Sequence, residues 1–328
     1  MSMFCFQCEQ TAGGTGCTVR GVCGKTEAAA GLQDMIVQAV KEIGFYCQKL
    51  RETGRRDEPA ERMILELLFA TVTNVNFSGE RLYSLFQEAV KTAERLEALC
   101  GEKLPEDSLI AKVAQTPSPL GVPVIEISDR VGIPRRCELL GEDVLSLQEL
   151  LMYGLKGTAA YAHHALVLGK EADEIYAYFA KALAALAVGK SSVDEWVSLV
   201  LECGMVNLKA MELLDAGHTE RFGHPEPTAV SVTPKPGKAI LVSGHDLPDL
   251  EELLKQTEGT GINVYTHGEM LPAHGYPALK KYPHLAGNYG GAWQDQRKEF
   301  AAFPGAILMT TNCLQDPRGY ENRIFTTG

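Results

Sequence analysis

The hydrophobic positions in the first two thirds of the sequence repeat with the period of amphipathic helices. Between residues 61 and 77, Ile64, Leu67 and Leu68 fall on one helical face, and the same spacing recurs over 80–100. Helical patterns also cover 26–50, 144–169, 171–188 and 192–215. Prolines between 115 and 136 predict an irregular connection. Six helices with short connections favour a helical bundle.

The pattern changes after residue 223. The segment 224–238 holds four prolines and is predicted to be a linker. Short apolar runs of strand character follow at 239–242, 262–265 and 306–309, and they alternate with helical patterns at 248–257 and 293–301. This alternation favours a parallel α/β sheet. The predicted organisation is a helical domain over 1–223 that includes the amino-terminal loop, the linker, and an incomplete α/β domain over 239–328.

The composition excludes several classes of protein. The chain has 31 Lys and Arg residues against 42 Asp and Glu, a formal net charge of −11, whereas nucleic acids and anionic membranes attract basic proteins. No run reaches the roughly 18 apolar residues that a membrane helix needs. The amino terminus lacks the basic and apolar regions of a signal peptide. These features predict a cytoplasmic protein that binds neither nucleic acid nor a membrane.

Four of the nine cysteines, Cys5, Cys8, Cys17 and Cys23, lie within the first 23 residues. In a reducing compartment, thiols clustered in this way are metal ligands more often than disulfide partners. Four thiolates suit tetrahedral zinc and an iron–sulfur cluster equally well, and simple reduced thiols are the remaining alternative. The glycine-rich loop lets backbone amides approach a metal-bound sulfur. The cysteines of the helical region are predicted to be ordinary buried thiols: Cys47, Cys100, Cys137 and Cys203.

A second group of ligand-type residues follows the predicted strands. His245, Glu269 and Cys313 each come a few residues after one of the three apolar runs. Because ligands gather at the carboxyl ends of parallel strands, these side chains are expected to meet at one edge of the sheet. An imidazole, a carboxylate and a thiolate form a mixed donor set suited to iron. Chance placement is the alternative, and His267 and His274 compete for the same role.

Seven sequence blocks resemble the hybrid-cluster protein (prismane) family, also called hydroxylamine reductases, and they occur in the family's order. The blocks are MFCFQCEQT (3–11), GCT (16–18), GVCGK (21–25), SGHD (243–246), HGEM (267–270), NYGGAW (288–293) and TNCL (311–314). The resemblance covers residues 3–328. It implies a helical amino-terminal domain of two three-helix bundles, followed by part of a Rossmann-like domain with a parallel sheet.

The resemblance also implies a chemistry. Cys5, Cys8, Cys17 and Cys23 would hold a cubane 4Fe–4S cluster, with the cysteine spacing of the family's anaerobe-type members. His245, Glu269 and Cys313 would ligate a hybrid iron–sulfur–oxygen cluster, at which hydroxylamine or a related small nitrogen oxide is reduced. A redox protein would donate the electrons, and the amino-terminal cluster would relay them.

The resemblance carries one departure. Family members continue past residue 328, and their remaining hybrid-cluster ligands lie in that part. The sequence is therefore expected to be a fragment of a longer chain, or else unable to complete the hybrid cluster as given. Two other functions remain open from the residues: an electron-transfer or binding module that keeps only the amino-terminal cluster, and a zinc-stapled helical scaffold.

Overall fold

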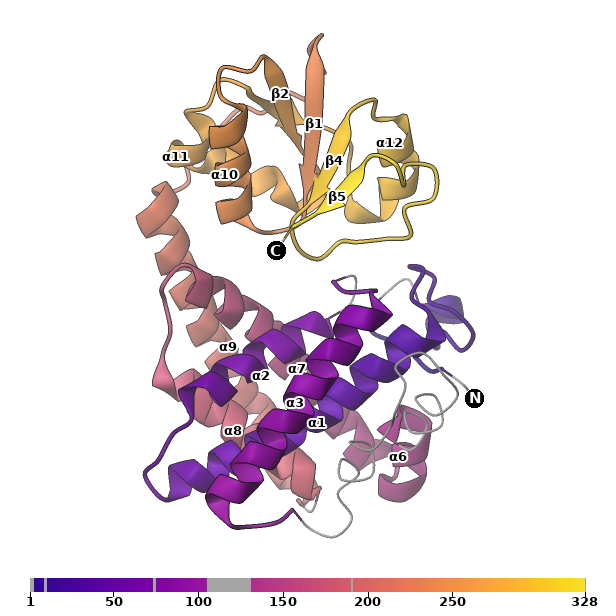
Figure 1. The fold of residues 1–328 in the computed structure, drawn as a ribbon, viewed down its shortest axis with the longest axis vertical. Coiled ribbons are helices and arrows are strands. Elements are labelled where there is room, and N and C mark those ends of the chain that lie inside the picture. Colours follow the sequence, from indigo (N-terminus) through magenta and orange to yellow (C-terminus); the bar gives the residue numbers. More distant parts are fainter. Residues whose placement is uncertain (1–2, 9–10, 73–74, 105–130, 190, 328) are drawn as a thin grey trace. The chain divides into compact units, whose positions relative to one another are not determined.

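The computed structural model describes residues 3–8, 11–72, 75–104, 131–189 and 191–327. The chain divides into two compact units (Figure 1). The first comprises Met1–Val72 and Asn76–Leu214, and the second comprises Thr73–Val75 and Asp215–Gly328. Helices make up the first unit and a parallel sheet of five strands forms the second, which confirms the predicted order of a helical part followed by an α/β part.

The helices of the first unit begin and end where the sequence provides caps. They are α1 (Glu27–Glu52), α2 (Glu58–Ala70), α3 (Gly79–Cys100), α6 (Ile133–Leu140), α7 (Glu142–Val167), α8 (Asp173–Val188) and most of α9 (Val193–Phe222), with a short 3-10 helix, η1 (Ala12–Gly14), before them. The side chains of Thr26, Asp57 and Ser78 each accept a hydrogen bond from a first-turn amide of α1, α2 and α3. Gly101 closes α3 in the left-handed conformation.

Two predicted boundaries are wrong. The helix predicted over 61–77 ends at Ala70, because the Thr71 hydroxyl donates to the Leu68 carbonyl at 2.8 Å and closes the last turn. The irregular connection predicted through residue 136 gives way to α6, in which Pro134 lies in the first turn, where its missing N–H costs no hydrogen bond. Residues 115–130 of that connection lie outside the described ranges.

The core of the first unit is centred on α1, which packs against α3 and α8. Gly44 marks the closest approach of α1 to α8, because a Cβ built on it would overlap Leu183 Cβ and lie 2.9 Å from Leu183 Cδ1. Among the described helices, none combines the length and the apolar character that crossing a bilayer would require.

A Gly44→Ala variant is expected to lose about 2 kcal/mol of unfolding free energy, because the added methyl forces α1 and α8 apart in a close-packed core. The measurement is urea unfolding followed by circular dichroism. Gly157→Ala in α7 is the matched control, since a Cβ there meets nothing within 4 Å and alanine favours a helix by up to about 1 kcal/mol. Equal stability of Gly44→Ala and the wild type would contradict this account of the helix contact.

The second unit is built on a sheet in which every neighbouring pair of strands is parallel. Its strands are β1 (Lys238–Ser243), β2 (Ile262–Thr266), β3 (Leu285–Asn288), β4 (Ala306–Met309) and β5 (Ile324–Thr326), in the order β3-β2-β1-β4-β5. The connections contain α10 (Leu247–Thr257), the 3-10 helix η2 (Gly268–Gly275), α11 (Pro277–Lys280), the 3-10 helix η3 (Trp293–Asp295) and α12 (Gln296–Ala302). Helices α10 and α12 flank the strands (Figure 1).

The segment 224–238 forms no helix and only reaches β1 at its last residue. It is tied to the second unit, since Glu226 N donates to Gly275 O at 2.9 Å and Lys235 N donates to the Tyr265 hydroxyl at 2.7 Å. The division of the chain at residues 223 and 239 stays a prediction.

Candidate metal centres

Three side chains of metal-binding type converge at the carboxyl edge of the sheet. His245 follows β1, Glu269 lies in η2 just after β2, and Cys313 follows β4. Because β1 pairs with both β2 and β4, the three loops leave neighbouring parallel strands at the same edge. The strand order also reverses between β1 and β4, and such switch points are where open α/β sheets bind ligands.

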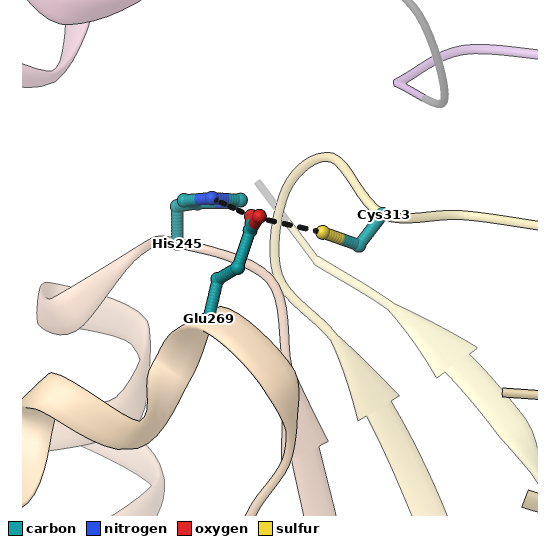
Figure 2. Close-up of side chains that lie close together, drawn as sticks. All are labelled: His245, Glu269 and Cys313. Carbon is teal, nitrogen blue, oxygen red and sulfur yellow. Dashed lines mark hydrogen bonds and ion pairs between the residues drawn. The ribbon is translucent and has the colours of Figure 1, made fainter. Parts of the chain in front are cut away.

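The ligand atoms of these three side chains all lie within 4.8 Å of one another. The Glu269 carboxylate lies between the other two, where its Oε2 contacts His245 Nε2 and accepts a hydrogen bond from Cys313 Sγ at 3.4 Å (Figure 2). Within the described parts of the chain, no other group of three or more His, Cys, Asp or Glu side chains meets as closely. The structure thus brings together the three residues that the sequence singles out.

A left-handed backbone residue precedes each of the three side chains. Gly244 has φ 107°, Gly268 has φ 56° and Asn312 has φ 46°. Asn312 and Cys313 itself, with φ 58°, are the two non-glycine residues of positive φ in the described ranges. Non-glycine residues adopt this conformation at a cost, and it persists where the surrounding structure imposes it. Sharp turns of the chain therefore aim all three side chains at one point.

Two threonines join the loop after β1 to the loop after β4. His245 N donates to the Thr311 hydroxyl at 3.2 Å, and Asp246 N donates to the Thr310 hydroxyl at 3.2 Å. These bonds hold the backbone that carries His245 next to the backbone that carries Cys313. The spacing of the two side chains is consequently set by these bonds from main-chain amides to threonine hydroxyls as well as by the sheet.

A hydrogen bond between a buried histidine and a glutamate supports the turn that carries Glu269. His267 is fully buried, and its Nε2 lies 2.7 Å from Glu299 Oε2. Glu299 also accepts a hydrogen bond from Gly291 N at 2.9 Å. His267 therefore fixes its turn to the loop before α12 rather than facing the three converging side chains. His274, the other competing histidine, bonds the Thr266 hydroxyl at 2.8 Å.

The electrostatics of the site suit a metal ion. Burial raises the pKa of the Cys313 thiol, and the nearby Glu269 carboxylate raises it further, so the free thiol is protonated at neutral pH. Metal binding reverses this preference, because a metal ligand must be deprotonated. The side chains of His245 and Glu269 remain 35% and 50% exposed, which leaves the site open to an incoming ion. The mixed nitrogen, oxygen and sulfur donors fit iron.

The amino-terminal cysteines lie on the loop before α1. Cys17 N donates to Cys5 O at 2.7 Å and Cys5 N to Cys17 O at 3.0 Å, which forms an isolated antiparallel bridge. The Cys17 sulfur accepts a hydrogen bond from Ala12 N at 3.4 Å, and the backbone of Lys25 bonds the Cys23 sulfur. Amide–sulfur hydrogen bonds of this kind tune iron–sulfur clusters, so the loop fits such a group.

Positive charge is buried beside these thiols. Burial opposes ionisation of Cys17, but backbone amides, a threonine hydroxyl and the charge of Lys25 outweigh it, and the pKa of Cys17 lies below its usual value. For Cys23 burial dominates and raises the pKa, although Lys25 acts against it. Lys25 is 1% exposed, and its Nζ donates to Gln33 Oε1 at 2.6 Å. The loop therefore favours the thiolate most clearly at Cys17.

The remaining cysteines are buried to different degrees. Of the other cysteines, Cys47 and Cys203 are buried as predicted, whereas Cys100 and Cys137 are only partly buried.

The sequence alone assigns no supporting role to five residues that the structure places around the two candidate sites. They are Lys25, His267, Glu299, Thr310 and Thr311. Lys25, His267 and Thr311 stand in the sequence blocks that carry the resemblance, so their position beside the ligand-type residues was an available signal. Glu299 had none, because it reaches His267 only through the folding of α12 onto the sheet.

Comparisons with known proteins agree on the family. The model of the Prismane/CO dehydrogenase family matches residues 3–328. The chain is 50% identical over 330 residues to the hydroxylamine reductase of Syntrophobacter fumaroxidans, and this match covers 99% of the chain. It is 49% identical over 337 residues to the enzyme of the same name from Maridesulfovibrio salexigens, again over 99% of the chain.

The match covers the relatives only in part. The chain spans about 60% of the length of both curated relatives. Among solved structures, carbon monoxide dehydrogenase IV from Carboxydothermus hydrogenoformans aligns with the whole chain and 49% of its own, at 15% identity and a TM-score of 0.38, which is too weak a likeness to support an inference. The family match and the close relatives show that the chain belongs to the Prismane/CO dehydrogenase family.

Proposed function

We propose that the chain forms part or all of an iron–sulfur oxidoreductase that reduces hydroxylamine, or a related small nitrogen oxide. The reaction would take place at a hybrid iron–sulfur–oxygen cluster held in part by His245, Glu269 and Cys313. The observation that carries this proposal is the convergence of these three side chains at the carboxyl edge of the sheet. The name of the close relatives, hydroxylamine reductase, supports the substrate class.

The amino-terminal loop has a separate part in this proposal. Cys5, Cys8, Cys17 and Cys23 would hold a 4Fe–4S cluster that passes electrons from a redox-protein donor in the cytoplasm. The amide–sulfur hydrogen bonds at Cys17 and Cys23 support this assignment. The proposal also includes the finer architecture that the resemblance implies, namely two three-helix bundles and a Rossmann-like sheet domain.

The reaction requires two electrons and two protons for each hydroxylamine and yields ammonia and water. The iron centre, when bound, would supply the electrons and the position at which the N–O group binds. Carboxylate oxygens leave iron more readily than thiolates do, and the half-exposed Glu269 has room to move. His245 Nε2 contacts Glu269 Oε2, so the two side chains are placed to hold the same iron centre. The buried Cys313 would remain a fixed ligand.

The test combines metal analysis with an activity assay on the complete gene product, purified without oxygen. We expect iron and acid-labile sulfide at well above about four atoms of each per chain. We also expect hydroxylamine-dependent oxidation of a reduced viologen, with one ammonia formed for every two electrons consumed. Zinc without iron would favour the helical scaffold instead. About four iron atoms without turnover would favour the electron-transfer module.

A further inference from the structure

A small polar cavity lies behind the first cysteine of the amino-terminal loop. Its volume is about 40 Å³, enough for one or two water molecules and too small for an organic ligand. Cys5 forms part of its wall. The wall also carries five ionisable side chains from α1, α6 and α7: Asp34, Lys41, Arg136, Glu149 and Lys156.

Positive charge on this wall exceeds negative charge. Arg136 bonds Glu149 directly, so the charges of these two side chains offset each other. Asp34 is then the one remaining carboxylate of the five side chains, and it faces the two lysines. Lys41 and Lys156 are 4% and 6% exposed. Lys156 Nζ donates to the Thr71 carbonyl at 3.5 Å and lies over the Tyr153 ring, and among the described residues it has no carboxylate partner. Among the described residues, Lys41 Nζ has neither a hydrogen-bond acceptor nor an ion-pair partner.

The two ammonium groups are poorly compensated by the surrounding protein. Burial lowers the pKa of Lys41 to about 7 and that of Lys156 to about 8. Burial likewise raises the pKa of Asp34 to about 6, which leaves its carboxylate mostly ionised at neutral pH, but this one carboxylate faces two lysines and offsets only part of their charge. An anion near a buried lysine favours the charged form of that lysine. The cavity wall is therefore suited to face a negatively charged group.

A cluster held by Cys5 is such a group. A cubane 4Fe–4S cluster with four thiolates carries net negative charge, and reduction adds one more negative charge to it. Lys156 already interacts electrostatically with the Cys5 sulfur. A buried cation at this position lowers the energy of the reduced cluster more than that of the oxidised one, because the interaction grows with the charge of the cluster and is weakly screened.

We propose that Lys41 and Lys156 set the reduction potential of the amino-terminal cluster, raising it through their buried ammonium groups in the wall of the cavity that Cys5 also lines. This inference rests on the proposed function, since it requires that cluster. Lys41 and Lys156 would act on the cluster through their charge, and neither would ligate iron. Reduction of the cluster takes up one electron from the donor, and no bond to either lysine forms or breaks.

The test is a potentiometric titration of the complete gene product, with the electron paramagnetic resonance signal of the reduced amino-terminal cluster as the readout. In Lys156→Met and in Lys41→Met, the equilibrium constant for reduction is expected to fall at least tenfold, which lowers the midpoint potential by at least about 59 mV. Lys156→Arg keeps the charge and is expected to restore the wild-type midpoint. Lys91→Met, on the exposed face of α3, is the matched control and is expected to change nothing.

Iron and sulfide contents separate the outcomes. Unchanged midpoints in both methionine variants, with wild-type iron and sulfide, would overturn the inference while leaving the proposed function intact. Such a result would mean either that a small anion offsets the charge of the two lysines or that the lysines are uncharged. A wild-type protein without iron would overturn the proposed function, and this inference with it. If a methionine variant loses its iron, Lys156→Gln and Lys41→Gln give the same prediction with a polar replacement.

Discussion

A Glu269→Gln variant of the complete gene product is expected to lose hydroxylamine reduction while it keeps the amino-terminal cluster. Glutamine preserves the shape of the side chain but removes the negative charge that contacts His245 Nε2 and would bind iron. Removing groups that merely orient metal ligands costs 10–100-fold, so loss of a ligand should lower turnover by more than about 100-fold. The measurements are the rate of viologen oxidation and the iron content of each variant.

The matched control for Glu269→Gln is Glu258→Gln. Glu258 is an exposed carboxylate at the end of α10 in the same unit, away from the three converging side chains. Its replacement is expected to leave turnover and iron content unchanged. Wild-type turnover in Glu269→Gln would remove Glu269 from the proposed reaction.

A Cys17→Ala variant is expected to lose the amino-terminal cluster and with it about four iron atoms per chain. Cys17 is 4% exposed, is joined to Cys5 by two backbone hydrogen bonds, and has the thiol whose pKa its surroundings lower. Turnover with the physiological donor should fall at least tenfold, since the relay would be broken, while iron at the sheet edge should remain.

Iron analysis and the visible spectrum measure the effect of Cys17→Ala. Cys137→Ala is its control, because Cys137 is a free, partly buried thiol of α6 and, among the described residues, forms no hydrogen bond with the sulfurs of the amino-terminal loop. It should retain all the iron. Equal iron contents in the two variants would show that Cys17 is not a ligand.

The periodic parts of the fold could be predicted because local chemistry determines them. Thr26 caps α1 and Gly101 ends α3 where the sequence indicates. The strand β3 was missed because its sequence, LAGN, has no apolar run, and it is held in the sheet by pairing with β2 and by Asn288 N donating to Ser231 O. The edge strand β5 does begin with the apolar pair Ile324-Phe325, but it is only three residues long, and its pairing with β4 rather than its local pattern makes it a strand.

The sequence predicted which side chains form the candidate site, but not the direction in which each of them points. The expectation that ligand-type residues after parallel strands meet at one edge led to His245, Glu269 and Cys313, and the structure brings these three together. The sequence could not separate Glu269 from His267, two positions earlier on the same turn. Their different directions depend on the left-handed Gly268 between them and on the bond from His267 to Glu299, a contact across 32 residues.

The dispersal of His245, Glu269 and Cys313 over three separate loops has a consequence for how the protein matures. An unfolded chain would have to close two long loops before these donors could share one ion, so it offers no acceptor of useful affinity. The donors come into register only when β1, β2 and β4 have paired. A metal centre held by these donors would therefore be inserted after the sheet has assembled, into a domain whose ligands are already gathered.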